Sequence, residues 1–289
     1  MSTPFYLGCA VWAYKEWVGP FYPKSSRPGS FLKLYAERLT TVEGNTTFYS
    51  VPSPKMVQRW ATMTPASFRF CPKLPRATTH DGALMSHMDA VLAFVDLMKG
   101  LGERLGPIFA QLPPSYSPAS LKDLAEFLSK WPHCEVPLAV EVRHLDWFKP
   151  DMAVQLNALL TRLGVGRVLL DTRLMYATGE PDPQFYSERK KPKVPLQPMV
   201  TAPFALVRYI GHPDLSKNET PLQSWAVQVK DWLDKGTTVY FFVHCPNETV
   251  SPDIARRFQS LLTQTGASVS PLPWDAVVDH TEPQQLGLF

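Results

Sequence analysis

Short apolar runs rich in β-branched and aromatic residues alternate along the chain with segments of helical periodicity, and this alternation restricts the fold more than any other feature. The apolar runs, which we expect to be strands, are residues 5–10, 41–45, 68–72, 107–111, 137–143, 167–171, 204–211 and 238–245. The expected helices are residues 30–38, 54–63, 84–99, 118–130, 151–163, 222–233 and 252–264. Strict alternation favours a parallel sheet, and eight strands favour closure into a single α/β domain, a (β/α)8 barrel of the TIM type.

The length of the chain agrees with this fold class. A chain of 289 residues suits one barrel, which takes about 250 residues, and we assign residues 1–280 to it and residues 281–289 to a carboxyl-terminal tail. The alternative is an open doubly wound sheet, but no glycine-rich phosphate-binding turn follows the first run. A long connection, residues 172–203, follows the sixth strand. Connections of this length are usually functional, and this one contains six prolines and a basic cluster of Arg189, Lys190, Lys191 and Lys193.

The composition argues against several classes of protein. Hydrophobic residues make up 45% of the chain and charged residues 19%, which argues against disorder. The net charge of +3 permits an anionic ligand but is small for a dedicated nucleic-acid-binding protein. No apolar run approaches the roughly 20 residues that a membrane-spanning helix needs, and the four cysteines form no CxxC pair. We therefore expect a cytoplasmic protein with reduced thiols and no membrane association.

Polar side chains gather at the carboxyl ends of the expected strands. Because alternate residues of a strand point to the same side, Glu43 and Asn45 should share the interior face of the second strand, and Glu141 and Arg143 that of the fifth. Arg208 has the equivalent position in the seventh strand. Four other strands end at or just before Lys73, Gln111, Asp171 and His244. We predict that these side chains converge on the mouth of the barrel, the ring formed by the carboxyl ends of the strands, as an active site or as a structural ion network.

Two further groups of residues could contact a ligand. Trp12 and Tyr14 follow the first strand and could stack on a sugar or a base, although an apolar lid is the alternative. A divalent metal is possible at the mouth, but the spacing of its candidate ligands matches no metal motif such as HExxH. Those candidates are Glu43, Glu141, Asp171, His80 and His244. No serine, histidine and acid pattern marks a nucleophile elbow.

Several segments, in order along the chain, carry a resemblance to one family. They are Gly8-Cys-Ala-Val-Trp12-Ala-Tyr14-Lys-Glu-Trp17, Glu43-Gly-Asn45-Thr-Thr47-Phe48-Tyr49, Lys73 with Thr79-His80, Gln111-Leu-Pro-Pro114, and Glu141-Val-Arg143-His144 with Trp147. These segments resemble the YecE-like family, an uncharacterised group also called domain of unknown function seventy-two. The resemblance implies a TIM-type barrel with these residues around the mouth, and no established activity. The chain departs from the family pattern at Ile210, where many members have histidine, and at Val243-His244, which replace an asparagine pair; we expect His244, with Asn247 nearby, to supply the polar group there.

The last five residues resemble the peptide with which bacterial replication and repair proteins bind the sliding clamp. The amide of Gln285 can form hydrogen bonds, while Leu286, Leu288 and Phe289 can fill an apolar cleft. The alternative is that the tail packs on its own barrel. Clamp binding would place the barrel near DNA and favour a nucleic-acid or nucleotide substrate.

The residues admit three hypotheses of function. The first is an enzyme that acts on a phosphate-containing or polyhydroxylated ligand, specifically a hydrolase linked to nucleic-acid maintenance. In it, Glu43 or Glu141 acts as general base with Asp171 as a further catalytic carboxylate, and Lys73, Arg143 and Arg208 stabilise anionic charge. The second is a sugar isomerase or lyase using the same carboxylates. The third is a noncatalytic adaptor that binds a ligand at the mouth and the clamp through its tail. The residues expected to complete the ligand site are Trp12, Tyr14, Asn45, His80, Gln111, His244 and Asn247.

Overall fold

Eight parallel strands form the inner layer of the protein, whose structure is a computed structural model that describes residues 3–177 and 191–277. The strands are β1 (Phe5–Cys9), β2 (Thr41–Gly44), β3 (Arg69–Pro72), β4 (Ile108–Gln111), β5 (Leu138–Glu141), β6 (Gly166–Asp171), β7 (Phe204–Ile210) and β8 (Thr238–His244). Their order in the sheet is β3-β2-β1-β8-β7-β6-β5-β4. Isolated bridges, Phe70 to Leu105 and Lys73 to Phe109, join β3 to β4. The sheet therefore curls into a nearly closed barrel, which confirms the predicted fold class.

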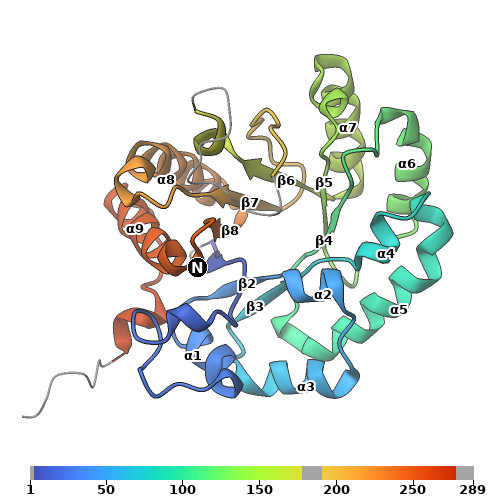
Figure 1. Ribbon diagram of the computed structural model, residues 1–289. Helices are drawn as coiled ribbons and strands as arrows, with labels where there is room; N and C mark the ends of the chain where they lie inside the picture. Colours follow the sequence, from blue (N-terminus) through green and yellow to red (C-terminus); the bar gives the residue numbers. More distant parts are fainter. Residues whose placement is uncertain (1–2, 178–190, 278–289) are drawn as a thin grey trace, which may run out of the picture.

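Helices surround the sheet as an outer layer (Figure 1). The α-helices of the described residues are α1 (Phe31–Ala36), α2 (Asn45–Tyr49), α3 (Pro54–Met63), α4 (Arg76–Thr79), α5 (Met88–Met98), α6 (Leu121–Ser129), α7 (Pro150–Leu163), α8 (Glu219–Asp234) and α9 (Ser251–Gln264). Every expected helix is present. The short helices α2 and α4 were not expected; α2 begins directly after β2 and α4 begins shortly after β3, so both lie at the mouth.

The alternation of side chains along the strands sorts apolar residues into two layers. Val42 of β2 and Val140 of β5 lie between the sheet and the helices. The barrel interior is filled instead by a second cluster, which contains Cys71, Phe109, Ala139, Leu206 and Phe242. The interior is thus apolar up to the level at which the polar residues of β2, β5 and β7 begin.

A close approach of β1 and β2 explains one glycine of the first loop motif. A Cβ atom added at Gly8 would lie 1.9 Å from the carbonyl oxygen of Thr41. Only glycine, which has no side chain, permits this contact.

No helix in the described ranges is both long enough and apolar enough to cross a membrane. All four cysteines carry free thiols, and three of them are buried.

Candidate functional site

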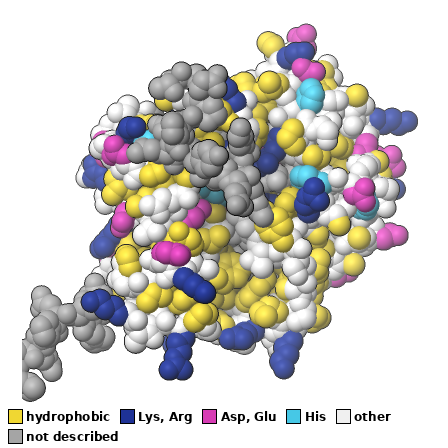
Figure 2. Space-filling view, viewed as in Figure 1, with side chains coloured by type: hydrophobic (Ala, Val, Ile, Leu, Met, Phe, Trp, Pro, Cys, Tyr) yellow, Lys and Arg dark blue, Asp and Glu magenta, His cyan; other side chains and the backbone are white. Residues whose placement is uncertain are grey.

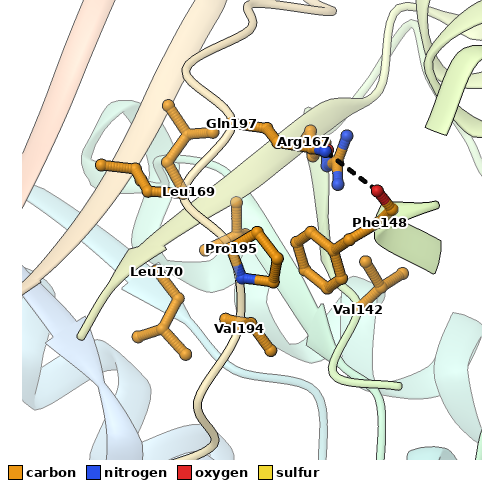
Figure 3. A pocket seen from close by; sticks show the side chains of 10 residues that line it. Val142, Phe148, Arg167, Leu169, Leu170, Val194, Pro195 and Gln197 are labelled. Atoms are coloured by element: carbon orange, nitrogen blue, oxygen red, sulfur yellow. Dashed lines mark hydrogen bonds between the residues drawn. The ribbon is translucent and has the colours of Figure 1, made fainter. Parts of the chain in front are cut away.

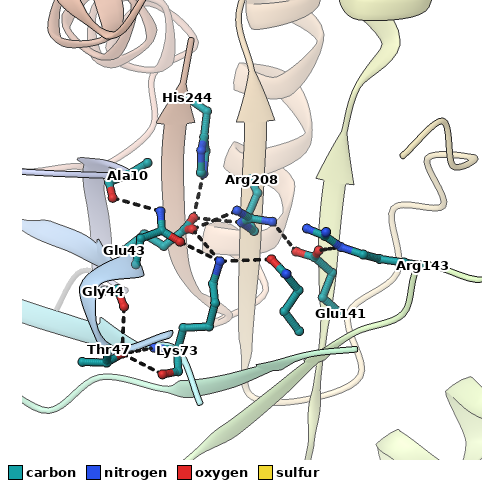
Figure 4. A network of polar contacts seen from close by, with 11 residues as sticks. Ala10, Glu43, Gly44, Thr47, Lys73, Glu141, Arg143, Arg208 and His244 are labelled. Carbon is teal, nitrogen blue, oxygen red and sulfur yellow. Dashed lines mark hydrogen bonds and ion pairs between the residues drawn. The ribbon is translucent and has the colours of Figure 1, made fainter. Parts of the chain in front are cut away.

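The centre of the site is Arg208, whose guanidinium lies between two carboxylates (Figure 4). Its Nε and Nη2 donate to the two oxygens of Glu43, each at 2.8 Å, and its Nη1 donates to Oε2 of Glu141 at 2.5 Å. No side chain of the three is more than 1% exposed. Because β2, β5 and β7 are not neighbours in the sheet, these bonds cross the interior of the barrel. The predicted convergence of Glu43, Glu141 and Arg208 is therefore found in the structure.

Lys73 joins this network from the end of β3. Its Nζ lies 2.6 Å from Oδ1 of Asn45, 3.0 Å from Oε1 of Gln111 and 3.3 Å from Oε1 of Glu43. An ammonium group has three N–H donors, so these three acceptors use all of them. Burial, reinforced by the charge of Arg208, lowers the pKa of Lys73 to about 7. Lys73 thus holds side chains of the β2 and β4 ends together, with its donors committed inside the protein.

Arg143 and His80 lie at the outer edge of the network. Arg143 Nε donates to Oε1 of Glu141 at 2.5 Å, and its side chain is 13% exposed. In Figure 4, Arg143 approaches Glu141 from the side opposite Arg208. The His80 ring packs edge-on against Phe48, with 5.2 Å between the ring centroids. Burial, helped by Arg76, Arg143 and Lys73, lowers the pKa of His80 to about 4, so its imidazole is neutral at pH 7.

Charge and burial fix the protonation of His244. Its Nε2 lies 2.6 Å from Oε2 of Glu43, and burial lowers the pKa of His244 to about 3. A neutral imidazole that faces a carboxylate donates through the nitrogen that carries hydrogen, so His244 is the Nε2–H tautomer. The polar contact expected for His244 is present.

Both carboxylates are ionised at neutral pH. Burial by itself would raise the pKa of Glu43, but Arg208, His244 and Lys73 hold it well below its usual range. Burial is likewise outweighed at Glu141, where Arg143 and Arg208 lower the pKa to about 2.

Asp171 does not join the network, and the prediction that it lies there is wrong. Its Oδ2 accepts hydrogen bonds from Nε1 of Trp225 on α8 at 2.7 Å and from Nη2 of Arg173 at 2.8 Å. Alternation places Leu170 toward the interior and Asp171 toward the helices. One face of β6 carries Val168 and Leu170, and the face of Asp171 carries Arg167 and Leu169. Because apolar residues occur on both faces, the sequence did not show which face points inward.

Three other candidates meet neighbours outside the network. The Trp12 ring packs edge-on against Trp60 at 5.5 Å, and the Tyr14 ring against Trp17 at 5.7 Å. Both contacts match the alternative of an apolar lid. Asn247 is exposed and accepts a hydrogen bond from the backbone of a short 3-10 helix, Glu248–Val250. The tail candidates lie outside the described residues; they are Gln285, Leu286, Leu288 and Phe289.

Two residues that were not proposed as site residues face the network. Lys191, part of the basic cluster in the sequence, is close enough to Arg208 and Glu43 for their charges to act on its pKa, which burial lowers to about 8. Glu248 follows β8, and its Oε2 accepts a hydrogen bond from Ser251 at 2.7 Å. Burial raises the pKa of Glu248 to about 7, although Ser251 and Lys191 oppose the shift. The basic cluster was a usable signal for Lys191, whereas no motif marked Glu248.

The network does not fit the possible divalent metal. Arg208 occupies the space between Glu43 and Glu141, and Lys73 and His244 take further positions around Glu43. Within residues 3–177 and 191–277, no group of three or more His, Cys, Asp or Glu side chains is placed to hold a metal ion. The arrangement is one of ion pairs and charged hydrogen bonds.

Comparison with known proteins identifies the family. The family model described as "Protein of unknown function DUF72" matches residues 6–277. The chain belongs to the DUF72 family. DUF72 proteins from Thermotoga maritima and Enterococcus faecalis have solved structures that show the same fold, with TM-scores of 0.67 and 0.66 at 21% and 20% identity. The matches cover 90% of this chain and 99% and 98% of those chains. The UPF0759 protein YecE of Escherichia coli K12 is 35% identical over 287 residues, which are 98% of this chain and 99% of YecE. The resemblance found in the sequence is confirmed.

Proposed function

We propose that the mouth of this DUF72 barrel binds a small ligand with an anionic group. The observation that carries the proposal is an excess of basic side chains. Four of them, Arg208, Arg143, Lys73 and Lys191, face two carboxylates, Glu43 and Glu141. Buried charge that is not offset is costly, and a bound anion would offset this excess.

Arg143 is the residue best placed to contact the ligand. Only its Nε is used by Glu141, and its Nη groups donate to no other residue within the described ranges. A guanidinium presents its donors in a planar fork that suits carboxylate and phosphate oxygens. The position of this guanidinium is held by the ion-pair network of Glu141, Arg208 and Glu43. The neutral imidazole of His80 offers a further polar contact.

We infer that such a ligand is a substrate and that Glu248 is the acid–base group of a hydrolase. Efficient general acids and bases have pKa values near the working pH. Glu248 meets this condition with a pKa raised by burial to about 7, whereas Glu43 and Glu141 are poor bases because their pKa values are lowered. A sugar isomerase or lyase would use the same groups, and an adaptor would bind without turnover.

Calorimetry and an activity screen test these proposals. Inorganic phosphate and acetate should bind the protein, and Arg143→Gln should weaken phosphate binding about tenfold, the loss of roughly one charged hydrogen bond. Arg162→Gln, on the exposed side of α7, is the matched control and should bind normally. A neutral polyol that binds as tightly as phosphate would contradict the anion site. Phosphate mono- and diesters, sugars and sugar phosphates, each with and without divalent metal, should reveal the reaction. Hydrolysis that survives in Glu248→Gln would contradict the acid–base role.

We also propose a second, independent interaction, with the bacterial sliding clamp. It rests on the sequence of Gln285–Phe289 alone: an amide followed by Leu286 and the pair Leu288 and Phe289. Binding would bring the barrel to DNA, where phosphate groups are abundant. A cytoplasmic location is part of this proposal and agrees with the four free thiols.

A further inference from the structure

The described end of the connection after β6 packs closely on the barrel. Val194 is buried against Leu170 and Ile210, at the carboxyl ends of β6 and β7. Nε2 of Gln197 donates to the carbonyl oxygen of Phe148 at 3.1 Å. Figure 3 shows Val194 and Gln197 lying along β6, where the remaining pocket has a volume of about 10 Å³, the space of about one water molecule. This part of the connection is therefore fixed against the strands that form the mouth.

The same packing fixes the backbone of Lys191. The hydroxyl of Tyr176 donates to the carbonyl oxygen of Lys191 at 2.6 Å, and Oγ1 of Thr172 donates to that of Pro192 at 3.3 Å. The Lys191 ammonium then lies near charged groups from four strands. The charges that shift the pKa of Lys191 are those of Arg208, Glu43, Arg143 and Glu141. The charge of Lys191 in turn lowers the pKa values of His244 and Glu248. Figure 2 shows Lys, Arg and His side chains close to the centre of this face.

Lys191 differs from Lys73 in what its ammonium contacts. Lys73 has three acceptors at hydrogen-bond or ion-pair distance. Lys191 forms no ion pair with another described residue, and burial, with the charge of Arg208, lowers its pKa to about 8. A half-buried ammonium with no carboxylate at ion-pair distance among the described residues is less favourable than a paired one. An anion that bound beside it would favour its charged form.

We propose that Lys191 and Arg143 together bind a phosphate group as its dianion, which makes Lys191 the residue that selects for the charge of the ligand. This inference rests on the anion-binding function proposed above. With both lysines protonated and Glu248 neutral, as its raised pKa allows near pH 7, four positive groups face two negative ones, and the excess of two matches a phosphate dianion. A carboxylate would offset only half of it. Phosphate also offers three acceptor oxygens, enough for the fork of Arg143 and the point charge of Lys191.

Titration of the full chain with inorganic phosphate and with acetate near pH 7 tests the role of Lys191. Lys191→Met should weaken phosphate binding by about tenfold or more and acetate binding by much less, because the dianion loses the stronger interaction. Lys191→Arg should keep most of the affinity. The matched control is Lys193→Met, two residues along the same segment, where the ammonium lies 5.5 Å from the centroid of the Tyr176 ring. It should change phosphate affinity by less than about twofold.

The possible failures separate the two proposals. Absence of binding of either anion to the wild-type chain at about 10 mM, where even a weak site would fill, would overturn both. Normal phosphate affinity in Lys191→Met would overturn the role of Lys191 and leave the anion site standing. Equal losses in Lys191→Met and Lys193→Met would do the same, since they would show a general effect of charge on the connection. Between pH 8 and 9, where Lys73 and Glu248 have largely lost their protons already, wild-type phosphate affinity should fall as Lys191 loses its proton, and Lys191→Arg should not show this fall.

Discussion

Arg208 on β7 donates two hydrogen bonds to the carboxylate of Glu43 on β2, although 165 residues of sequence separate them. Two strands, β1 and β8, lie between β2 and β7 in the sheet, so the contact spans the barrel interior. Glu43 is fully buried and Arg208 is 1% exposed. Removal of either partner would leave the other with one opposite charge fewer inside the barrel, which is costly for a buried group. The pair therefore makes the mouth a fixed platform for the side chains around it.

Glu141→Gln should lower the free energy of unfolding by about 3–5 kcal/mol, because the amide leaves Arg143 and buried Arg208 without their shared carboxylate. Urea denaturation would measure the change. Glu126→Gln removes an exposed carboxylate whose Oε1 lies 3.6 Å from Nζ of Lys130 and should change stability by less than about 1 kcal/mol. Unchanged stability in Glu141→Gln, together with lost ligand binding, would show that Glu141 acts on the ligand and does not mainly support the fold.

His244 should make the protein less stable in mild acid. Its pKa is lowered by burial from 6.5 to about 3, so between these values the unfolded chain binds a proton that the folded protein does not. Stability should fall as the pH falls below 6.5, by about 1.4 kcal/mol per pH unit from this group. In His244→Gln, whose amide can still donate to Glu43, the decline between pH 6 and 5 should be shallower by that amount. His133→Gln, at the other end of the barrel, should keep the wild-type decline; if His244→Gln keeps it as well, the imidazole is not neutral in the folded protein.

Asp171→Ala should affect stability and not ligand binding. The change removes the acceptor of the buried Trp225 indole N–H, which costs about 1–3 kcal/mol when such a donor is left unsatisfied. Phosphate affinity should stay at the wild-type value, because Asp171 faces α8. Thermal unfolding and calorimetry on one preparation would measure both quantities. Loss of phosphate affinity in a fully folded variant would show that Asp171 contributes to the ligand site.

Deletion of residues 285–289 should abolish binding to a bacterial sliding clamp and leave the melting temperature of the barrel unchanged. An extended peptide with two apolar anchors should bind on the order of micromolar, because ordering it costs entropy. Surface plasmon resonance would compare the intact chain, the deletion and a Leu288→Ala, Phe289→Ala double variant. Equal binding by all three would refute the tail as the contact, and a lower melting temperature on deletion would show that the tail packs on the barrel.

The direction of a strand side chain could be predicted from the sequence where one face of the strand is apolar and the other is polar. In β5, Leu138 and Val140 form one apolar face, so Glu141 had to point inward, and it does. In β6 apolar residues occur on both faces, with Arg167 at the start of the face that carries Asp171, and the same rule left the side of Asp171 undecided. The contact of Trp12 with Trp60 depends on where α3 packs, and hydrophobic periodicity predicts the helix but not its packing. The pKa of Glu248 depends on groups on β2 and in the β6–β7 connection. These groups are distant in the sequence, so only the folded chain shows that Glu248 belongs near the site.

The junction of β3 and β4 gives the barrel a preferred line of opening. Other neighbouring strands pair through ladders, but this pair meets through isolated bridges. Lys73 spans the junction, since its ammonium holds Asn45 beyond β2 and Gln111 at the end of β4. Local unfolding begins where the fewest contacts must break, so amide exchange should be fastest along this line. A ligand that stabilised the charged form of Lys73 would slow that exchange. The exchange rate of the amides at the β3–β4 junction would then report how long the barrel stays closed, and so whether the mouth is occupied.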